Sequence, residues 1–182
     1  MSKLKEIYQK EIIPKLQTAL NKKNILSLPK LVKVTLNIGL GDAIERKDPK
    51  ITEAAKETLF KITGQKPVET KAKKAIAGFK IREGQIVGLK VTLRRHKMYD
   101  FIDKLINITL PRRRDFRGLD SDGVDAMGNL SIGIKDQVIF PEINPQNIDK
   151  THGLQITIST DAGNKENGIL FFKLLGIPFK EK

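Results

Sequence analysis

Four segments of this chain alternate between apolar and polar residues, and this period of two constrains the fold more than any other feature. They are residues 32–38, 86–93, 130–134 and 154–158. A period of two indicates strands with one dry and one polar face. Such strands predict a largely antiparallel sheet with helices packed on one face. The free face would display the polar members of the first two segments: Lys33, Thr35, Asn37, Lys90 and Thr92.

Apolar residues recur at helical spacing between these strands. Residues 1–20 are expected to form one amphipathic helix that Pro14 kinks or splits. Helices are also expected after Asp48-Pro49 as far as Gly64, and from Met98 to a stop at Pro111. Further expected elements are a short strand over 67–71, a long basic loop over 72–85, an irregular segment over 143–151 and a short last helix over 169–175, after the weak point at Gly168. No repeat or low-complexity linker divides the chain, so we expect one α+β domain over residues 1–182.

Positive charge is concentrated in one stretch, Lys71 to Arg117. This stretch holds 14 basic and four acidic residues, so it carries +10 of the net charge of +13. Such a field is expected of a protein that meets a polyanion, first a nucleic acid and second an anionic membrane surface. The longest apolar run, Ile169 to Phe172, is too short to span a bilayer, so we expect a soluble protein.

Residue patterns for catalysis or metal binding are weak. The chain has no cysteine, and His96 and His152 have no partner at metal-ligand or triad spacing. The segment from Asp120 to Asp125 resembles a calcium loop only superficially, because its glycine falls at the fourth place. We therefore predict a protein that is not an enzyme and that needs no metal or cofactor.

Several basic residues have a structural alternative. Lys97 and Lys104 flank Asp100 on the third helix and suit a solvated surface. Arg112, Arg113 and Arg114 follow a helix that ends at proline, where cations also favour the helix C-terminus. Phe79, the one aromatic residue of the basic loop, is either a core residue or a surface that packs on sugar or base.

Specific motifs in the same stretch are similar to a known family. They include Gly64-Gln65-Lys66-Pro67, Thr70-Lys71-Ala72-Lys73-Lys74, Ala77-Gly78-Phe79-Lys80-Ile81-Arg82-Glu83-Gly84, Leu110-Pro111-Arg112-Arg113-Arg114-Asp115-Phe116-Arg117-Gly118-Leu119 and Gly176-Ile177-Pro178-Phe179-Lys180. These blocks resemble, in order and over essentially the whole chain, the bacterial large-subunit ribosomal protein family that binds 5S ribosomal RNA, numbered five in that subunit.

The resemblance implies a structural protein of the central protuberance, located in the bacterial cytoplasm on the ribosome. Its expected partners are 5S rRNA, adjoining 23S rRNA, the P-site tRNA and small-subunit ribosomal protein thirteen. Together with the free sheet face, it gives these rRNA-binding candidates: Lys33, Thr35, Asn37, Gln65, Thr70, Lys71, Lys90, Thr92, Arg94, Arg112 and Arg114. The tRNA-contact candidates are Lys73, Lys74, Phe79, Lys80 and Arg82.

One segment departs from the family pattern. The family usually has Phe-Asp-Gly-Arg-Gly-Asn-Tyr where this chain has Val124-Asp125-Ala126-Met127-Gly128-Asn129-Leu130. Two aromatic residues and an arginine are missing, so an RNA contact through that arginine is not expected here. The turn through Gly128 and Asn129 should survive. A second class of function also stays open, in which the basic loop docks an acidic protein partner.

Overall fold

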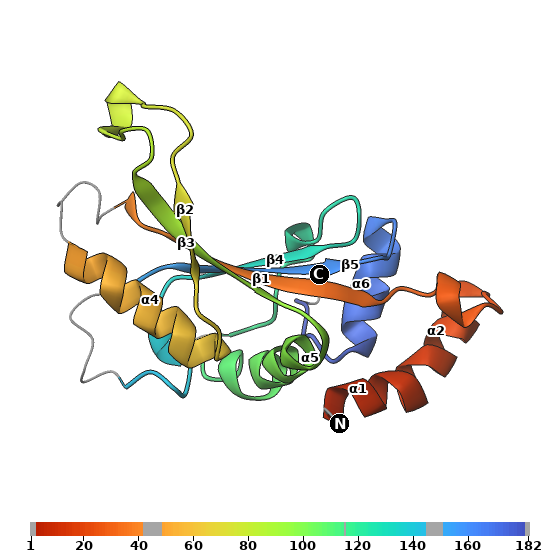
Figure 1. Ribbon diagram of the computed structural model, residues 1–182. Helices are drawn as coiled ribbons and strands as arrows, with labels where there is room; N and C mark the ends of the chain where they lie inside the picture. Colours follow the sequence, from red (N-terminus) through yellow and green to blue (C-terminus); the bar gives the residue numbers. More distant parts are fainter. Residues whose placement is uncertain (1–2, 42–48, 115, 145–150, 181–182) are drawn as a thin grey trace. The chain divides into compact units, whose positions relative to one another are not determined.

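The computed structural model describes residues 3–41, 49–114, 116–144 and 151–180. Five strands form one largely antiparallel sheet in the order β2-β3-β1-β5-β4, and helices accompany it, so the predicted α+β class is confirmed (Figure 1). The strands are β1 Leu31–Gly39, β2 Val68–Lys71, β3 Ile86–Leu93, β4 Leu130–Ile134 and β5 Leu154–Thr160. The α-helices are α1 Lys3–Ile7, α2 Ile13–Leu20, α4 Pro49–Thr63, α5 Arg95–Lys104 and α6 Lys165–Leu174. Shorter helical segments are η1 Tyr8–Ile12, η2 Ile25–Ser27, η3 Ala77–Phe79, η4 Leu105–Thr109, η5 Ser121–Gly123 and η6 Gln137–Ile139.

The chain forms two compact units, each built from separated segments. Unit one consists of residues 1–34, 93–132 and 157–182, and unit two of residues 35–92 and 133–156. Every passage of the chain from one unit to the other lies within a strand. The single domain over residues 1–182 stays a prediction. In the described ranges, no helix has the length and apolar character needed to cross a membrane.

The N-terminal helix of unit one changes its winding just before Pro14, where a kink or a split was predicted. Helix α1 leads into η1, a π-helical turn in which the Ile13 N–H donates to the Tyr8 carbonyl, and α2 follows. Proline lacks an N–H and crowds the carbonyl four residues earlier, and a wider turn relieves both problems. The helix therefore continues through Pro14 without a break.

Aromatic side chains fill the core of unit one. Phe171 and Phe172 of α6 are fully buried, and the Tyr8 ring meets Phe171 edge-on at 6.2 Å between centroids. The Tyr8 hydroxyl donates to the Pro29 carbonyl at 3.0 Å. Burial is the main cause that raises the pKa of Tyr8 to about 12. Tyr8 thus ties the N-terminal helix to both α6 and the segment that leads into β1.

The prediction for the last helix was too short. Helix α6 begins at Lys165, so Gly168 lies inside it rather than ahead of it. A Cβ at Gly168 would lie 2.6 Å from the Cα of Gly128, whose own φ is +82°. Two glycines let the backbone of α6 touch the backbone of the 124–130 turn. Gly168 is therefore a packing residue inside the helix and not a weak point ahead of it.

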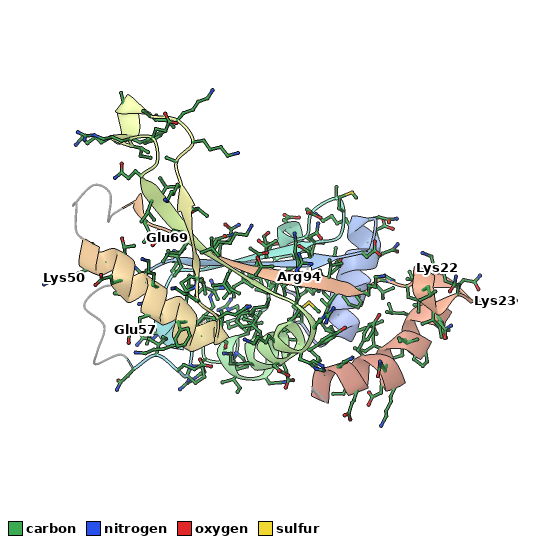
Figure 2. The ribbon with its side chains drawn as sticks, viewed as in Figure 1. Lys22, Lys23, Lys50, Glu57, Glu69 and Arg94 are labelled. Carbon is green, nitrogen blue, oxygen red and sulfur yellow. The ribbon has the colours of Figure 1, made fainter. Side chains whose placement is uncertain are left out.

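In unit two, α4 covers one side of the strands. Its buried residues Ile51, Ala55, Leu59 and Ile62 follow the predicted stripe, and Gly64 in the left-handed conformation ends the helix. Lys56 of α4 forms an ion pair with Glu69 of β2; Figure 2 labels Glu69. The predicted N-cap Asp48 lies outside the described residues. The position of α4 leaves the opposite side of β2 and β3 uncovered by this helix.

Two strand predictions need correction at their ends. Val32 was expected to face inward, but its side chain is 40% exposed, while Leu31 is buried in its place. Burial along β1 does not alternate further on either, because Val34, Thr35 and Leu36 are all buried in this central strand. Strand β5 runs to Thr160 and helix α5 begins at Arg95, each beyond the predicted limit.

Candidate nucleic-acid interface

The pairing of β2 with β3 defines a polar face in unit two. In this antiparallel pair Val68 lies opposite Lys90, and Thr70 lies opposite Gly88. Directly opposed residues point to the same side of a sheet, and residues two apart on one strand do so as well. Val68, Thr70, Lys90 and Thr92 therefore share one face, which we call the open face.

The other side of the same strands is occupied. Glu69 pairs with Leu89, and both lie on the α4 side, where Leu89 is buried and Glu69 bonds to Lys56. That side-chain hydrogen bond is the largest cause of the lowered pKa of Glu69. The one carboxylate of β2 is thus turned away from the open face, whose charged member is Lys90.

Three other candidates of unit two lie at different depths. Asn37 is half-buried between the buried Leu36 and Ile38 of β1, so its side chain is on the polar side of this strand. Thr35 was predicted to be displayed, yet only 9% of it is exposed. β1 is the central strand, and its neighbours cover a short side chain. Gln65 is half-buried, and its Oε1 is enclosed without a hydrogen-bond partner among the described residues.

A register shift falls just before Lys71. Thr70 lies opposite Gly88 but Lys71 lies opposite Ile86, so an irregularity falls between Thr70 and Lys71. A bulge of this kind bends a strand and redirects its side chains. Lys71 is exposed and stands where the sheet passes into the basic loop.

The predicted long basic loop forms the end of a hairpin. Its stem is closed by hydrogen bonds from the Ala72 N–H to the Gln85 carbonyl at 2.8 Å and from the Gly84 N–H to the Ala72 carbonyl at 3.0 Å. Nearer the tip Ile76 pairs with Ile81, and η3 forms the turn. Figure 1 shows this hairpin extending from β2 and β3 well past the end of these strands. We call residues 72–85 the hairpin tip.

All five tRNA-contact candidates lie on the hairpin tip and are exposed: Lys73, Lys74, Phe79, Lys80 and Arg82. The Phe79 side chain is 71% exposed, so the alternative of a core residue is wrong. Lys80 has φ of +54°, which closes the turn after η3. The tip carries four cations and the single acid Glu83. Long side chains project from it into solvent (Figure 2).

The remaining candidates belong to unit one. Lys33 is half-buried on β1, and Arg94 is exposed just before α5. Arg112 and Arg114 are exposed in the turn after η4, where the Arg113 N–H donates to the Leu110 carbonyl. The structure places them in two groups within this unit, one on the chain at β1 and α5 and one at the end of η4.

The 124–130 turn survives, as predicted. The Asp125 carboxylate accepts from the Met127 N–H at 2.9 Å and from the Asn129 N–H at 2.8 Å, and its other oxygen accepts from the Asn129 side chain. The Asn129 side-chain bond is the largest cause that lowers the pKa of Asp125. Asn129 and Gly128 in turn accept from Thr160 of β5.

Sequence reasoning missed two exposed apolar residues of the candidate interface. Val68 is 67% exposed on the open face beside Lys90, and Ile76 is exposed on the hairpin tip near Phe79. The signal for Val68 was its place two residues before Thr70 on a predicted strand. Apolar groups beside cations and hydroxyls offer contacts to ribose and base as well as to phosphate.

Comparisons with known proteins agree with the resemblance in the motifs. The family model described as ribosomal protein L5 matches residues 24–82, and the model for the C-terminus of the same ribosomal family matches residues 86–179. The chain is 52% identical over 180 residues to the large ribosomal subunit protein uL5 of Geotalea daltonii, with 99% of each chain covered. It is 51% identical over 180 residues to the protein of the same description in Citrifermentans bemidjiense, again with 99% of each chain covered.

Proposed function

The chain belongs to the ribosomal protein L5 family, and from this premise we propose that it is a structural, non-enzymatic component of the large ribosomal subunit. Its place is then the cytoplasmic ribosome, and ribosomal RNA is its main partner. The identity extends over almost the full length of relatives that carry this description.

More specifically, the open face binds 5S rRNA, together with adjoining 23S rRNA, in the central protuberance. The observation that carries this proposal is that Thr70, Lys90 and Thr92 share one face of β2 and β3 while α4 lies on the other. Short hydroxyl side chains on a rigid sheet give hydrogen bonds to ribose 2′-hydroxyls and phosphates at fixed positions. Asn37, Gln65 and Lys71 extend the same set. Arg94, Arg112 and Arg114, with Lys33, are further rRNA-binding candidates in unit one.

The hairpin tip has a separate role, the contact with the P-site tRNA. Its cations suit the phosphates of a tRNA, and exposed Phe79 suits packing on a sugar or base. The bridge to small-subunit ribosomal protein thirteen rests on family membership alone.

Two matched variants separate the two surfaces. Lys90→Ala with Thr92→Val alters only the open face, and Lys73→Ala with Lys80→Ala and Arg82→Ala alters only the hairpin tip. The first should weaken binding of 5S rRNA to the isolated protein by roughly tenfold or more, since one charge-assisted contact and one hydroxyl contact are lost. The second should leave 5S rRNA binding nearly unchanged and weaken P-site tRNA binding in ribosomes that contain it. Equal effects of both variants on 5S rRNA would contradict the division.

The hairpin tip also supports a second candidate function. Ile76 and Phe79 are exposed beside four cations, which suits an acidic protein partner as well. In that case the triple variant would leave P-site tRNA binding intact and abolish capture of the protein partner.

A further inference from the structure

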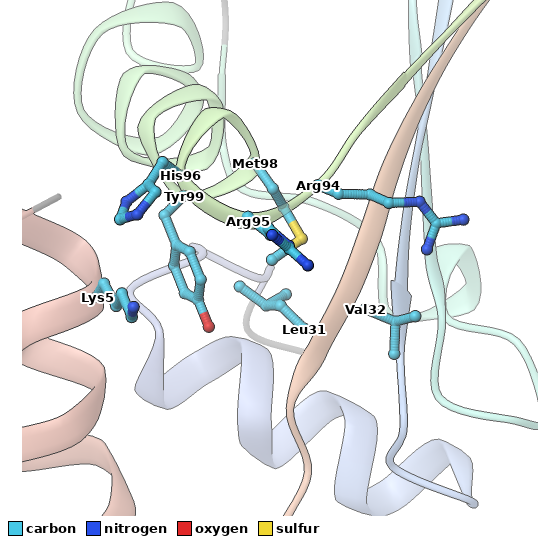
Figure 3. Close-up of a pocket in the computed structure, with 8 residues that line it drawn as sticks. All are labelled: Lys5, Leu31, Val32, Arg94, Arg95, His96, Met98 and Tyr99. Atoms are coloured by element: carbon cyan, nitrogen blue, oxygen red, sulfur yellow. The ribbon is translucent and has the colours of Figure 1, made fainter. Parts of the chain in front are cut away.

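Unit one contains a pocket whose lining includes no residue of the open face or the hairpin tip. It has a volume of about 600 Å³, within the range of small-ligand sites. Helix α1, the start of β1 and the first turn of α5 contribute its walls (Figure 3). The residues that line it are Lys5, Leu31, Val32, Arg94, Arg95, His96, Met98 and Tyr99.

The charge of this pocket has one sign. Three of its residues, Lys5, Arg94 and Arg95, are cations, and no Asp or Glu lines it. Within the described ranges none of these three cations forms a salt bridge. An uncompensated group of this kind raises the local concentration of anions. The ligand of the pocket is therefore expected to carry negative charge.

The cations do not all point the same way. In Figure 3 the Arg95 side chain lies on the same side of β1 as Leu31 and Tyr99, whereas Arg94 extends to the other side of this strand, beside Val32. Arg95 has φ of +53° and Arg94 has extended backbone. Arg94 can therefore contact RNA at the proposed rRNA surface, while Arg95, Lys5 and the rings of His96 and Tyr99 line the pocket.

The rest of the lining favours a ligand with a flat ring. Leu31 and Met98 are buried and give an apolar floor, and the rings of His96 and Tyr99 stand beside it. The Tyr99 hydroxyl, whose pKa burial raises above its ordinary value of 10, is protonated at neutral pH and can donate to an acceptor. An apolar floor offers a small hydrated anion no favourable contact. Nucleobases, in contrast, stack on aromatic rings and guanidinium planes.

We propose that this pocket binds an unstacked nucleotide of an RNA, with its phosphate at Arg95 and Lys5 and its base against Tyr99, His96 and the apolar floor. The ligand class rests on the proposed function, because ribosomal RNA is the expected partner. The pocket would give unit one an RNA attachment point that is independent of the open face in unit two.

Tyrosine fluorescence provides a direct test. The chain has two tyrosines and no tryptophan, so a Tyr8→Phe protein emits from Tyr99 alone. A short single-stranded oligoribonucleotide should quench this emission to saturation, and adenosine monophosphate should do so at least tenfold more weakly. In the same background Arg95→Asn should raise the Kd about tenfold, since asparagine tolerates the left-handed backbone but lacks the charge. Lys173→Ala, which removes an exposed cation elsewhere in unit one, should have no such effect.

Other results would overturn the inference. Tighter binding of adenosine monophosphate than of the oligoribonucleotide would make this a free-nucleotide site. If inorganic phosphate displaced the oligoribonucleotide at the same concentration as the nucleotide does, the base would contribute nothing to binding. Equal or tighter binding of an oligoglutamate peptide would assign the pocket to an acidic protein. An unchanged Kd in Arg95→Asn would exclude the pocket. Should Arg95→Asn fail to fold, Lys5→Ala tests the contribution of the other cation that faces the proposed phosphate.

This assay contains no 5S rRNA, so the two proposals can fail separately. Loss of 5S rRNA preference with intact quenching by the oligoribonucleotide would contradict the proposed function alone. Preserved 5S rRNA preference with no quenching would contradict the pocket alone.

Discussion

Replacing Gly168 by alanine should destabilise the protein, although the same substitution usually stabilises a helix. In most helix interiors Gly→Ala stabilises by about 1 kcal/mol. Here the new methyl group would lie 2.6 Å from the Gly128 Cα, and backbone cannot move away as a flexible side chain can. We expect Gly168→Ala to lower the free energy of unfolding by about 1 to 3 kcal/mol in urea titrations.

Gly133→Ala is the matched control, because nothing lies within 4 Å of the position its Cβ would take. This variant should stay within about 1 kcal/mol of the native protein. A Gly168→Ala protein as stable as the native chain would show that α6 and the 124–130 turn are not in backbone contact.

Asp125 should make the stability of the protein depend on pH in the acid range. Its pKa is lowered on folding, so it stabilises the fold above its ordinary value of 3.8 and the effect is lost as the pH falls through the lowered pKa. Asp125→Asn should lower the free energy of unfolding at pH 7 by about 0.5 to 1 kcal/mol, a modest value because the group is exposed. Thermal unfolding should show this difference shrinking below pH 3.8.

Asp136→Asn makes the same chemical change at an exposed position whose side chain forms no cap hydrogen bond. At pH 7 its free energy of unfolding should stay within about 0.5 kcal/mol of the native protein. A constant difference for Asp125→Asn across the acid range would mean that the carboxylate charge does not hold the turn.

At the scale of elements, the hairpin tip should be separable from the sheet. Its stem closes at Ala72 and Gln85, and most residues beyond these two are exposed. Replacing residues 73–84 by Asn-Gly, a dipeptide that forms tight hairpin turns, should keep the free energy of unfolding within about 1 kcal/mol. Urea titration measures the stability, and 5S rRNA binding should persist. A large loss of stability would show that the tip helps to hold β2 and β3 together.

The elements themselves could be predicted from sequence where one period dominates. Residues 86–93 alternate regularly and form β3, and the stripe from Ile51 to Ile62 forms α4. The start of α6 was missed because glycine has a low helix propensity. In the fold, Gly168 packs against the backbone of Gly128, a residue 40 positions earlier in the chain, and local sequence does not reveal this contact. Val32 was misplaced because Leu31 takes the buried position at the start of β1, which the apolar pattern alone does not reveal.

At the scale of the whole molecule, the sequence was sufficient to predict the family and the candidate surface. It was not sufficient to predict which residues of that surface are buried. The motifs and the charge of residues 71–117 indicated an RNA-binding protein, and the matched family agrees. Thr35 is covered because β1 is the central strand, which is a property of the sheet order. The pocket beside Tyr99 joins residues from three distant segments, so no local pattern could have indicated it.

On the proposed function, a shaped surface and not charge alone binds one particular RNA. The most direct measurement compares binding of the isolated protein to 5S rRNA and to a structured RNA of equal length, at about 50 and about 200 mM salt. If roughly six cations meet phosphates, log affinity should fall with log salt at a slope of about −4 to −5, yet the preference for 5S rRNA should persist at the higher salt. Equal binding to both RNAs that disappears at the higher salt would contradict the account.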